Sequence, residues 1–130
     1  MTLTISDALS KGVDAHQTGN YHEAEELYRF VLSSNPKNPD ANHNLGSLSI
    51  IFNKIDDAIS YFKKALKADP KIEQFWMSYI GVLIDENKFN SAKLALSKAR
   101  KLGLSNNFIV KYNKIILSKI QNPSPPFSEI

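Results

Sequence analysis

The sequence contains no cysteine, which excludes disulfide bonds, thiolate metal sites and a cysteine nucleophile. Its three histidines, His16, His22 and His43, do not have the HxxxH or HExxH spacing of a zinc site on a helix. The sequence also lacks a G-x-S-x-G motif and a phosphate-binding glycine loop. We therefore expect no catalytic residue, no metal, no cofactor and no small-molecule substrate. The sequence predicts a protein that is not an enzyme.

Two pairs of adjacent carboxylates, Asp56–Asp57 and Asp85–Glu86, are the remaining candidates for acid–base chemistry. Neighbouring residues on a helix point in different directions, so the members of each pair cannot easily act on one reacting group. Each pair lies near the end of an expected helix. We expect both pairs to cap a helix or to face solvent.

Long apolar runs are absent as well. No stretch approaches the roughly 18 apolar residues needed to span a bilayer, and Met1–Leu9 has neither the basic start nor the apolar run of a signal peptide. With 42% hydrophobic and 22% charged residues, the composition is that of a globular chain. We expect a cytoplasmic protein that does not associate with membranes.

Basic residues are unevenly distributed. Residues 1–60 carry 4 basic and 8 acidic side chains, whereas residues 61–130 carry 12 and 5. The basic residues that dominate the second half are Lys88, Lys93, Lys98, Arg100, Lys101, Lys111, Lys114 and Lys119. Only one of these is an arginine, and no aromatic-rich loop that could stack on bases is interleaved with them. The pattern favours solvated helix faces over a nucleic-acid interface.

A repeat with a period of about 34 residues organises the chain. Ala24, Ala58 and Ala92 are separated by this interval. The same interval relates Tyr28, Phe62 and Leu96, and also Tyr21, Ile55 and Phe89. A fixed period in this range indicates a repeat architecture rather than a single irregular core.

Helical periodicity and breaker residues divide each period into two helices. Gly19 and Gly103 suit the left-handed conformation that ends a helix, and Pro36 and Pro70 stop the helices that precede them. The expected helices are Thr4–Gln17, Tyr21–Ser34, Asp40–Phe52, Ile55–Ala68, Ile72–Glu86, Phe89–Leu102 and Asn106–Ile120. After the seventh helix, prolines at positions 123, 125 and 126 predict an extended tail or linker.

With two helices in each period, the chain resembles the tetratricopeptide repeat (TPR) family, whose signature is W-x2-L-G-x2-Y, then A-x3-F, then P. The second repeat has Leu45, Gly46, Ala58, Phe62 and Pro70, with Asn42 in place of the tryptophan. The first repeat has Gly12, Ala24, Tyr28 and Pro36, with Lys11 in place of the leucine. The third has Trp76 and Ala92, with Tyr79–Ile80 in place of Leu–Gly and Leu104 in place of the proline.

The resemblance implies an all-α fold, a right-handed α-α superhelix (TPR solenoid) of three helix-turn-helix repeats with a C-terminal capping helix. A TPR domain is expected over residues 1–120, with repeats at about 5–38, 39–72 and 73–104 and the capping helix at 106–120. Residues 121–130 are the proline-rich tail or linker. Independently of the family, Gly12, Gly46 and the repeated alanines are expected where the two helices of a repeat touch.

In this family the first helices of the repeats line a concave groove that binds peptides or partner segments. The positions here that match the groove are Leu9, Val13, Gln17, Asp40, His43, Asn44, Ser47, Ile51, Gln74, Met77, Ser78, Gly81 and Asp85. Of the positions at which some members clamp the carboxylate end of a chaperone tail, only Asn44 keeps a matching residue. The resemblance therefore disfavours an adaptor for chaperone tails.

Two interpretations stay open for several of these residues. His43 and Asn44 either hydrogen-bond a peptide backbone, or Asn44 braces the adjacent repeat. His16 is expected to pack at the edge of the first helix. Trp76 is either an aromatic anchor for a ligand or, as its family position implies, part of the core.

Three functions are consistent with the sequence. The first is a non-catalytic protein–protein interaction scaffold that binds a peptide or partner protein in its groove. The second is the N-terminal TPR segment of a larger bacterial transferase, for example a glycosyltransferase, that engages an acceptor or a partner. The third is a module that self-associates into a homo-oligomer. The identity of the partner does not follow from the residues.

Overall fold

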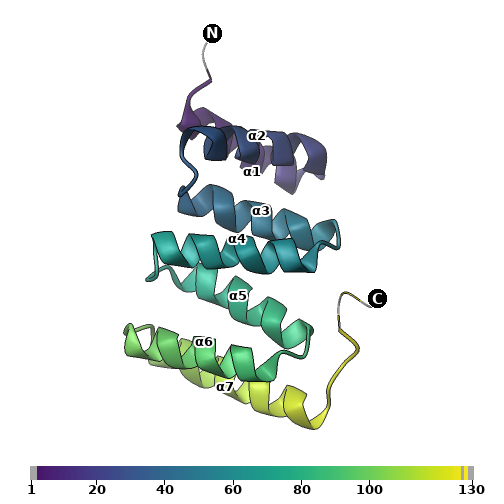
Figure 1. Cartoon of the computed structure of the whole chain (residues 1–130), viewed down its shortest axis with the longest axis vertical. Coiled ribbons are helices and arrows are strands. Elements are labelled where there is room, and N and C mark those ends of the chain that lie inside the picture. Colours follow the sequence, from purple (N-terminus) through teal and green to yellow (C-terminus); the bar gives the residue numbers. More distant parts are fainter. Residues whose placement is uncertain (1–2, 127, 129–130) are drawn as a thin grey trace. The chain divides into compact units, whose positions relative to one another are not determined.

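The computed structural model describes residues 3–126 and 128, and these residues form seven α-helices and no strand (Figure 1). The helices are α1 (Ile5–Gln17), α2 (Tyr21–Ser34), α3 (Pro39–Ile51), α4 (Ile55–Ala68), α5 (Glu73–Asp85), α6 (Phe89–Lys101) and α7 (Asn106–Gln121). Every end lies within one residue of the expected position. The predicted all-α fold is confirmed.

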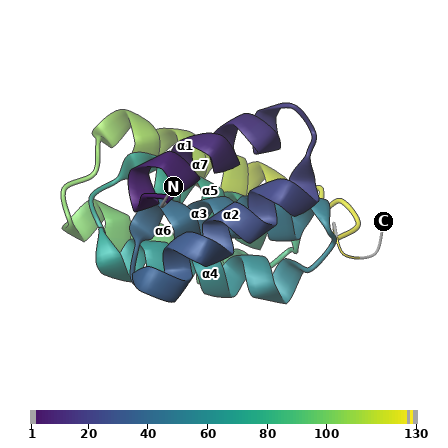
Figure 2. The same cartoon turned by 90° about the horizontal axis from the view of Figure 1, so that it is seen from above.

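The described residues group into two compact units, one within Met1–Asp69 and the other within Pro70–Ile130. In the first unit, α1 packs against α2 and α3 packs against α4, while α2 and α3 join the two hairpins (Figures 1 and 2). In the second unit, α6 packs against both α5 and α7. Within each unit, consecutive helices therefore stack and bury an apolar stripe between them.

A left-handed residue closes each hairpin. Gly19, Asn53 and Asn87 have positive φ values of 83°, 56° and 60° and are separated by the interval of the repeat. In all three turns the residue that follows donates its backbone N–H to the carbonyl five residues earlier, at 2.7–2.8 Å. This is the bond that ends a helix in a Schellman motif. Glycine and asparagine recur here because they adopt positive φ at lowest cost.

Close approach within a hairpin requires glycine at two equivalent positions. A Cβ atom on Gly12 would lie 2.6 Å from Cε1 of Tyr28, and one on Gly46 would lie 2.4 Å from Cε1 of Phe62. Both rings are fully buried. The expected helix contact at these glycines is confirmed, and the missing side chain is what lets the aromatic ring of the second helix fill the interior.

The alanines of the repeat complete the core. Ala24, Ala58 and Ala92 are fully buried. In the second unit, Phe108 and Ile116 of α7 are buried, so α7 covers the apolar side of α6 as a capping helix would. The division into repeats, cap and tail stays a prediction.

Candidate partner-binding surfaces

The first candidate surface lies on α1 and α3, which contact each other within the first unit. It comprises the predicted groove residues Leu9, Val13, Gln17, Asp40, His43, Asn44, Ser47 and Ile51, none of which is buried. Val13 and Ile51 are the large apolar members that solvent reaches most, with exposed fractions of 37% and 45%. Exposed apolar side chains beside amides and hydroxyls provide both kinds of contact that a peptide ligand needs.

Not every residue of this surface is equally free to meet a ligand. Leu9 packs against the core clusters of the first unit. Ser47 Oγ donates a hydrogen bond to the carbonyl of His43 at 3.4 Å, a local bond typical of serine within a helix. Leu9 therefore contributes to the core as well as to the first surface, whereas Val13 and Ile51 are the apolar residues that a ligand can reach.

His43 is held by its own neighbours. Its Nδ1 lies 3.4 Å from Oδ1 of Asn44, and its ring lies 5.4 Å from the Phe62 ring, centroid to centroid. Burial lowers the pKa of His43 below 6.5, and the hydrogen bond with Asn44 and the charge of Asp40 oppose this shift. Burial thus favours the neutral form of the His43 imidazole, which also packs against Phe62 of α4.

The second candidate surface lies on α5 in the second unit. It comprises Gln74, Met77, Ser78, Gly81 and Asp85, all of them exposed or partly exposed. A Cβ atom on Gly81 would meet nothing within 4 Å. Unlike Gly12 and Gly46, Gly81 therefore leaves open space instead of accommodating an aromatic ring.

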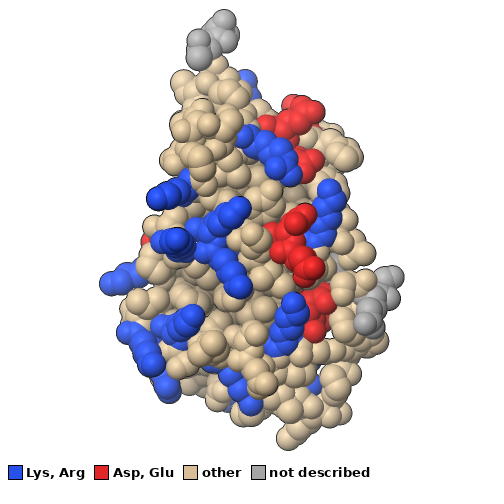
Figure 3. All heavy atoms as spheres, viewed as in Figure 1, with Lys and Arg blue, Asp and Glu red and all other residues tan. Residues whose placement is uncertain are grey.

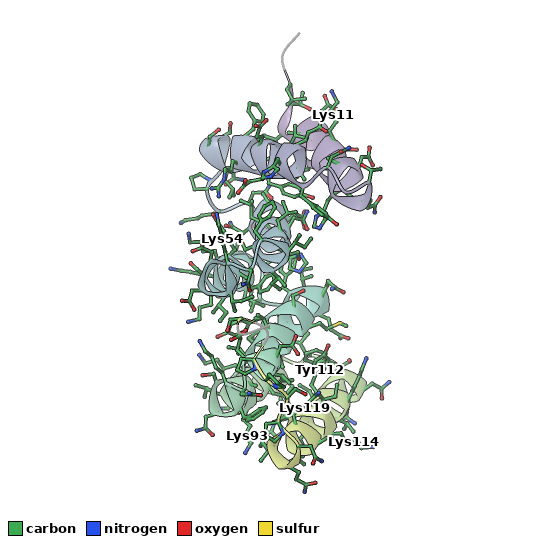
Figure 4. All side chains as sticks on the ribbon, turned by 90° about the vertical axis from the view of Figure 1, so that its right-hand side faces the viewer. Lys11, Lys54, Lys93, Tyr112, Lys114 and Lys119 are labelled. Atoms are coloured by element: carbon green, nitrogen blue, oxygen red, sulfur yellow. The ribbon has the colours of Figure 1, made fainter. Side chains whose placement is uncertain are left out.

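Two residues of α7 accompany this surface and were missed in the sequence. Burial raises the pKa of the Asp85 carboxyl, while the charge of Lys119 lowers it and that of Glu86 raises it. Burial also raises the pKa of Tyr112, and the charge of Glu73 adds to the increase. Figure 4 shows Tyr112 and Lys119 on the side of α7 toward α5. A cation and a phenol thus border the second surface.

A sequence signal for these two residues existed. Tyr112 follows Ser78 by the interval of the repeat, and Lys119 follows Asp85 by the same interval. Both therefore continue the series of groove positions from α5 into α7. The signal was hidden because α7 lacks the small residues that mark the other repeats.

Trp76 belongs to the core rather than to a binding surface. It is only 5% exposed, and its indole N–H donates to the carbonyl of Pro70 at 2.7 Å. Asn42, at the equivalent position of the preceding repeat, is likewise buried, and its amide donates to the carbonyl of Pro36 at 3.1 Å. The core interpretation of Trp76 is confirmed. His16 also packs as expected, with Nδ1 3.4 Å from the hydroxyl of Tyr28.

Charges on the second helix of the second repeat follow the helix dipole. Asp56 and Asp57 lie in the first turn of α4 and Lys67 in its last. Figure 3 shows acidic atoms over the start of this helix and basic atoms over its end. In α6, the last turn carries Lys98, Arg100 and Lys101. Carboxylates at the start of a helix and cations at its end are stabilising, so these charges contribute to the stability of the helices.

No group of three or more potential metal ligands among histidine, aspartate and glutamate comes together within residues 3–126 and 128. Nor is any helix in this described part of the chain both long and apolar enough to cross a membrane.

Helical hairpins that recur at a fixed interval along the chain define a helical repeat protein. The family model for the tetratricopeptide repeat matches residues 9–71, and solved TPR structures share the fold of the chain. The tetratricopeptide repeats that the signature residues predicted are thus confirmed over residues 9–71.

Three solved structures illustrate the shared fold. A mutant O-GlcNAc transferase from Thermobaculum terrenum is 24% identical, with a TM-score of 0.68 over 76% of this chain, which spans only 19% of that protein. The first TPR of Spaghetti (RPAP3), bound to an HSP90 peptide, is 19% identical, with a TM-score of 0.76 over 91% of this chain and 94% of its own. The Sgt2 TPR domain from Aspergillus fumigatus is 23% identical, with a TM-score of 0.72 over 96% of this chain and 87% of its own.

Proposed function

We propose that this protein is a non-catalytic interaction module that binds an extended peptide or a partner protein on the faces of the first helices of its repeats. The observation that carries the proposal is the accessibility of the matching residues. None of the thirteen is buried, and they include the exposed apolar side chains of Val13 and Ile51. At positions that match the binding groove of the family, exposed apolar side chains would contact a ligand.

The chemistry of the first surface suggests the kind of ligand. Val13 and Ile51 would contact apolar side chains, while Asn44 and Gln17 would hydrogen-bond the ligand backbone. The Spaghetti domain is bound to an HSP90 peptide, which shows that this fold can hold a peptide. Because the cationic clamp residues are missing here, we propose a ligand recognised along its length rather than by a terminal carboxylate.

A peptide display experiment tests this function. Peptides selected from a random library on the parent protein should lose at least tenfold in affinity when Ile51 is changed to arginine, since a charge would replace an apolar contact. Phe30→Arg is the matched control, because Phe30 is 39% exposed on α2, outside the first surface. Equal affinity for the parent and Ile51→Arg, measured by calorimetry, would remove the first surface from the proposal.

A second candidate is the TPR segment of a larger bacterial transferase in the cytoplasm. The likeness to the Thermobaculum terrenum transferase favours it, since that enzyme is a transferase that contains this fold. Sequencing the gene beyond codon 130 tests it: a continuing reading frame that encodes a transferase would support the segment, and a stop codon would exclude it. The third candidate, a homo-oligomer, predicts a molar mass that rises with concentration in sedimentation equilibrium.

A further inference from the structure

Two residues that follow α7, Ser124 and Ser128, lie against the turn between α5 and α6, within the second unit. The side-chain amide of Asn87 donates to the carbonyl of Ser124 at 2.9 Å. Both the backbone N–H and the hydroxyl of Ser128 donate to the carboxylate of Glu86, at 2.9 and 2.7 Å. Asn87 thus binds the backbone carbonyl of Ser124, and Glu86 binds Ser128, which lies four residues further along the chain.

The chemistry of this turn differs from that of its equivalents. Glu86 is the residue that ends α5, where the helix dipole disfavours a carboxylate, and here two donors of Ser128 compensate it. At the same place the other hairpins have Thr18 and Phe52, neither of which has a carboxylate to accept two bonds. Among the three hairpin turns, only the α5–α6 turn therefore combines a carboxylate acceptor, Glu86, with an amide donor, Asn87.

We propose that the α5–α6 turn is a binding site for extended, proline-rich segments that carry a serine, and that the chain's own C-terminal segment is its displaceable occupant. This site adjoins the second candidate surface at Asp85 but uses other residues, and it does not depend on the proposed function. Prolines at positions 123, 125 and 126 restrict the segment before it binds, which lowers the entropy lost on docking. A partner would present a backbone carbonyl and, four residues further on, a serine.

Ser124 is joined covalently to α7 by a short stretch of chain, and this link determines how tightly another segment must bind to displace it. Ser124 follows the end of α7 by three residues, and a tether of this length gives an effective concentration on the order of millimolar. A partner segment with micromolar affinity would displace the occupant, whereas the same sequence supplied as a free peptide would need millimolar concentration. The contact can therefore respond to a partner without any change in the fold of the helices.

Backbone ¹⁵N NMR on the full chain tests the docking. In the parent, the Ser128 amide should show a dispersed chemical shift and a high heteronuclear NOE. Glu86→Ala and Ser128→Ala should reduce the docked population by about tenfold, because each removes bonds to a charged group. Asn87→Gly should weaken docking less, since it keeps the positive φ and removes only the amide. Asn53→Gly is the matched control, because Asn53 has the same conformation in a turn that holds no tail.

Displacement is tested by adding an unlabelled peptide of residues 122–128 to the labelled full chain. At millimolar peptide the Ser128 signal should move toward the position that it has in Glu86→Ala, and a peptide with alanine for Ser128 should not cause this movement. The proposal is overturned if Ser128 has the NOE of a flexible chain in the parent, or if Glu86→Ala leaves its signal unchanged. A Ser128 signal that does not respond to the serine peptide would equally reject a displaceable site. Ser128→Ala keeps the test decisive if Glu86→Ala does not fold.

Discussion

Gly46 of α3 leaves no room for a side chain against Phe62 of α4: its Cβ would lie 2.4 Å from Cε1 of the ring. A side chain at this position must displace a fully buried ring. In the third repeat the equivalent positions are Ile80 and Leu96, so a larger residue on the first helix accompanies a smaller one on the second. The second repeat thus fills its interior with an aromatic ring beside a glycine, and the third repeat does so with two aliphatic side chains.

Gly46→Ala should therefore lower the free energy of unfolding by about 1 to 2 kcal/mol, since overpacking outweighs the gain in helix propensity. Gly81→Ala is the control: beyond its chain neighbours and its own helix backbone, an added Cβ would meet nothing within 4 Å, and alanine should stabilise α5 by about 0.5 to 1 kcal/mol. Urea unfolding followed by circular dichroism measures both. If the two variants changed stability in the same direction, the close contact at Gly46 would not be a constraint.

Asn42 should be a stabilising residue despite its departure from the family signature. Its amide donates to the carbonyls of Pro36 and Asn38, at 3.1 and 3.0 Å. Asn42→Ala should cost about 1 to 3 kcal/mol of unfolding free energy, because it removes two hydrogen bonds from a buried side chain. Asn90→Ala, at an exposed position of α6, should change it by less than about 0.5 kcal/mol. Equal effects in chemical denaturation would contradict a structural role for Asn42.

The capping role of α7 can be tested at two adjacent apolar residues. Ile116 is fully buried and Leu117 is 51% exposed. Ile116→Ala should cost about 2 to 5 kcal/mol, because it leaves a cavity, whereas Leu117→Ala should stay within about 0.5 kcal/mol of the parent. Thermal unfolding monitored by circular dichroism separates them. A larger loss for Leu117→Ala would show that α7 packs with its other face.

The pH dependence of stability should carry a contribution from His43. Its pKa in the folded state is lowered from 6.5 by burial, so the unfolded chain binds its proton first as the pH falls. Stability should therefore decrease as the pH drops through 6.5 toward the lower folded-state pKa. Burial shifts the pKa of His16 in the same direction.

His43→Gln should make stability less dependent on pH between about 7.5 and 5.5, because it removes one of these titrating groups. Urea midpoints at the two pH values provide the measurement. An identical pH slope in the parent and His43→Gln would show that the packing of His43 against Phe62 does not affect its protonation.

Much of the fold was predictable because the signals that determine it are local. Proline at positions 36 and 70 and the left-handed residues Gly19 and Asn53 mark the helix ends directly. The equivalence of Gly12 and Gly46 predicted a close helix contact, which is confirmed. These inferences needed only the interval between residues and the size of their side chains.

The candidate surfaces were less predictable. The groove positions follow from the repeat interval, yet the sequence does not show that Leu9 packs partly into the core or that His43 rests on Phe62. Asp85 and Glu86 lie at the end of α5 as expected, but the sequence does not show that Glu86 also receives two hydrogen bonds from Ser128. The partner of Glu86 is distant in the chain, and no local pattern indicates it.

The amino-acid order alone specified the helices, their pairing into hairpins and the small and large residues at their contacts, because helical periodicity, backbone restriction and side-chain volume act over a few neighbouring positions. Tertiary packing was needed to show that Asn42 replaces the hydrogen bond made by Trp76 and that Tyr112 and Lys119 border the α5 surface. It also showed that Ser124 and Ser128 hydrogen-bond to the α5–α6 turn. Such contacts depend on where packing brings side chains from distant segments, and the sequence pattern does not specify those positions.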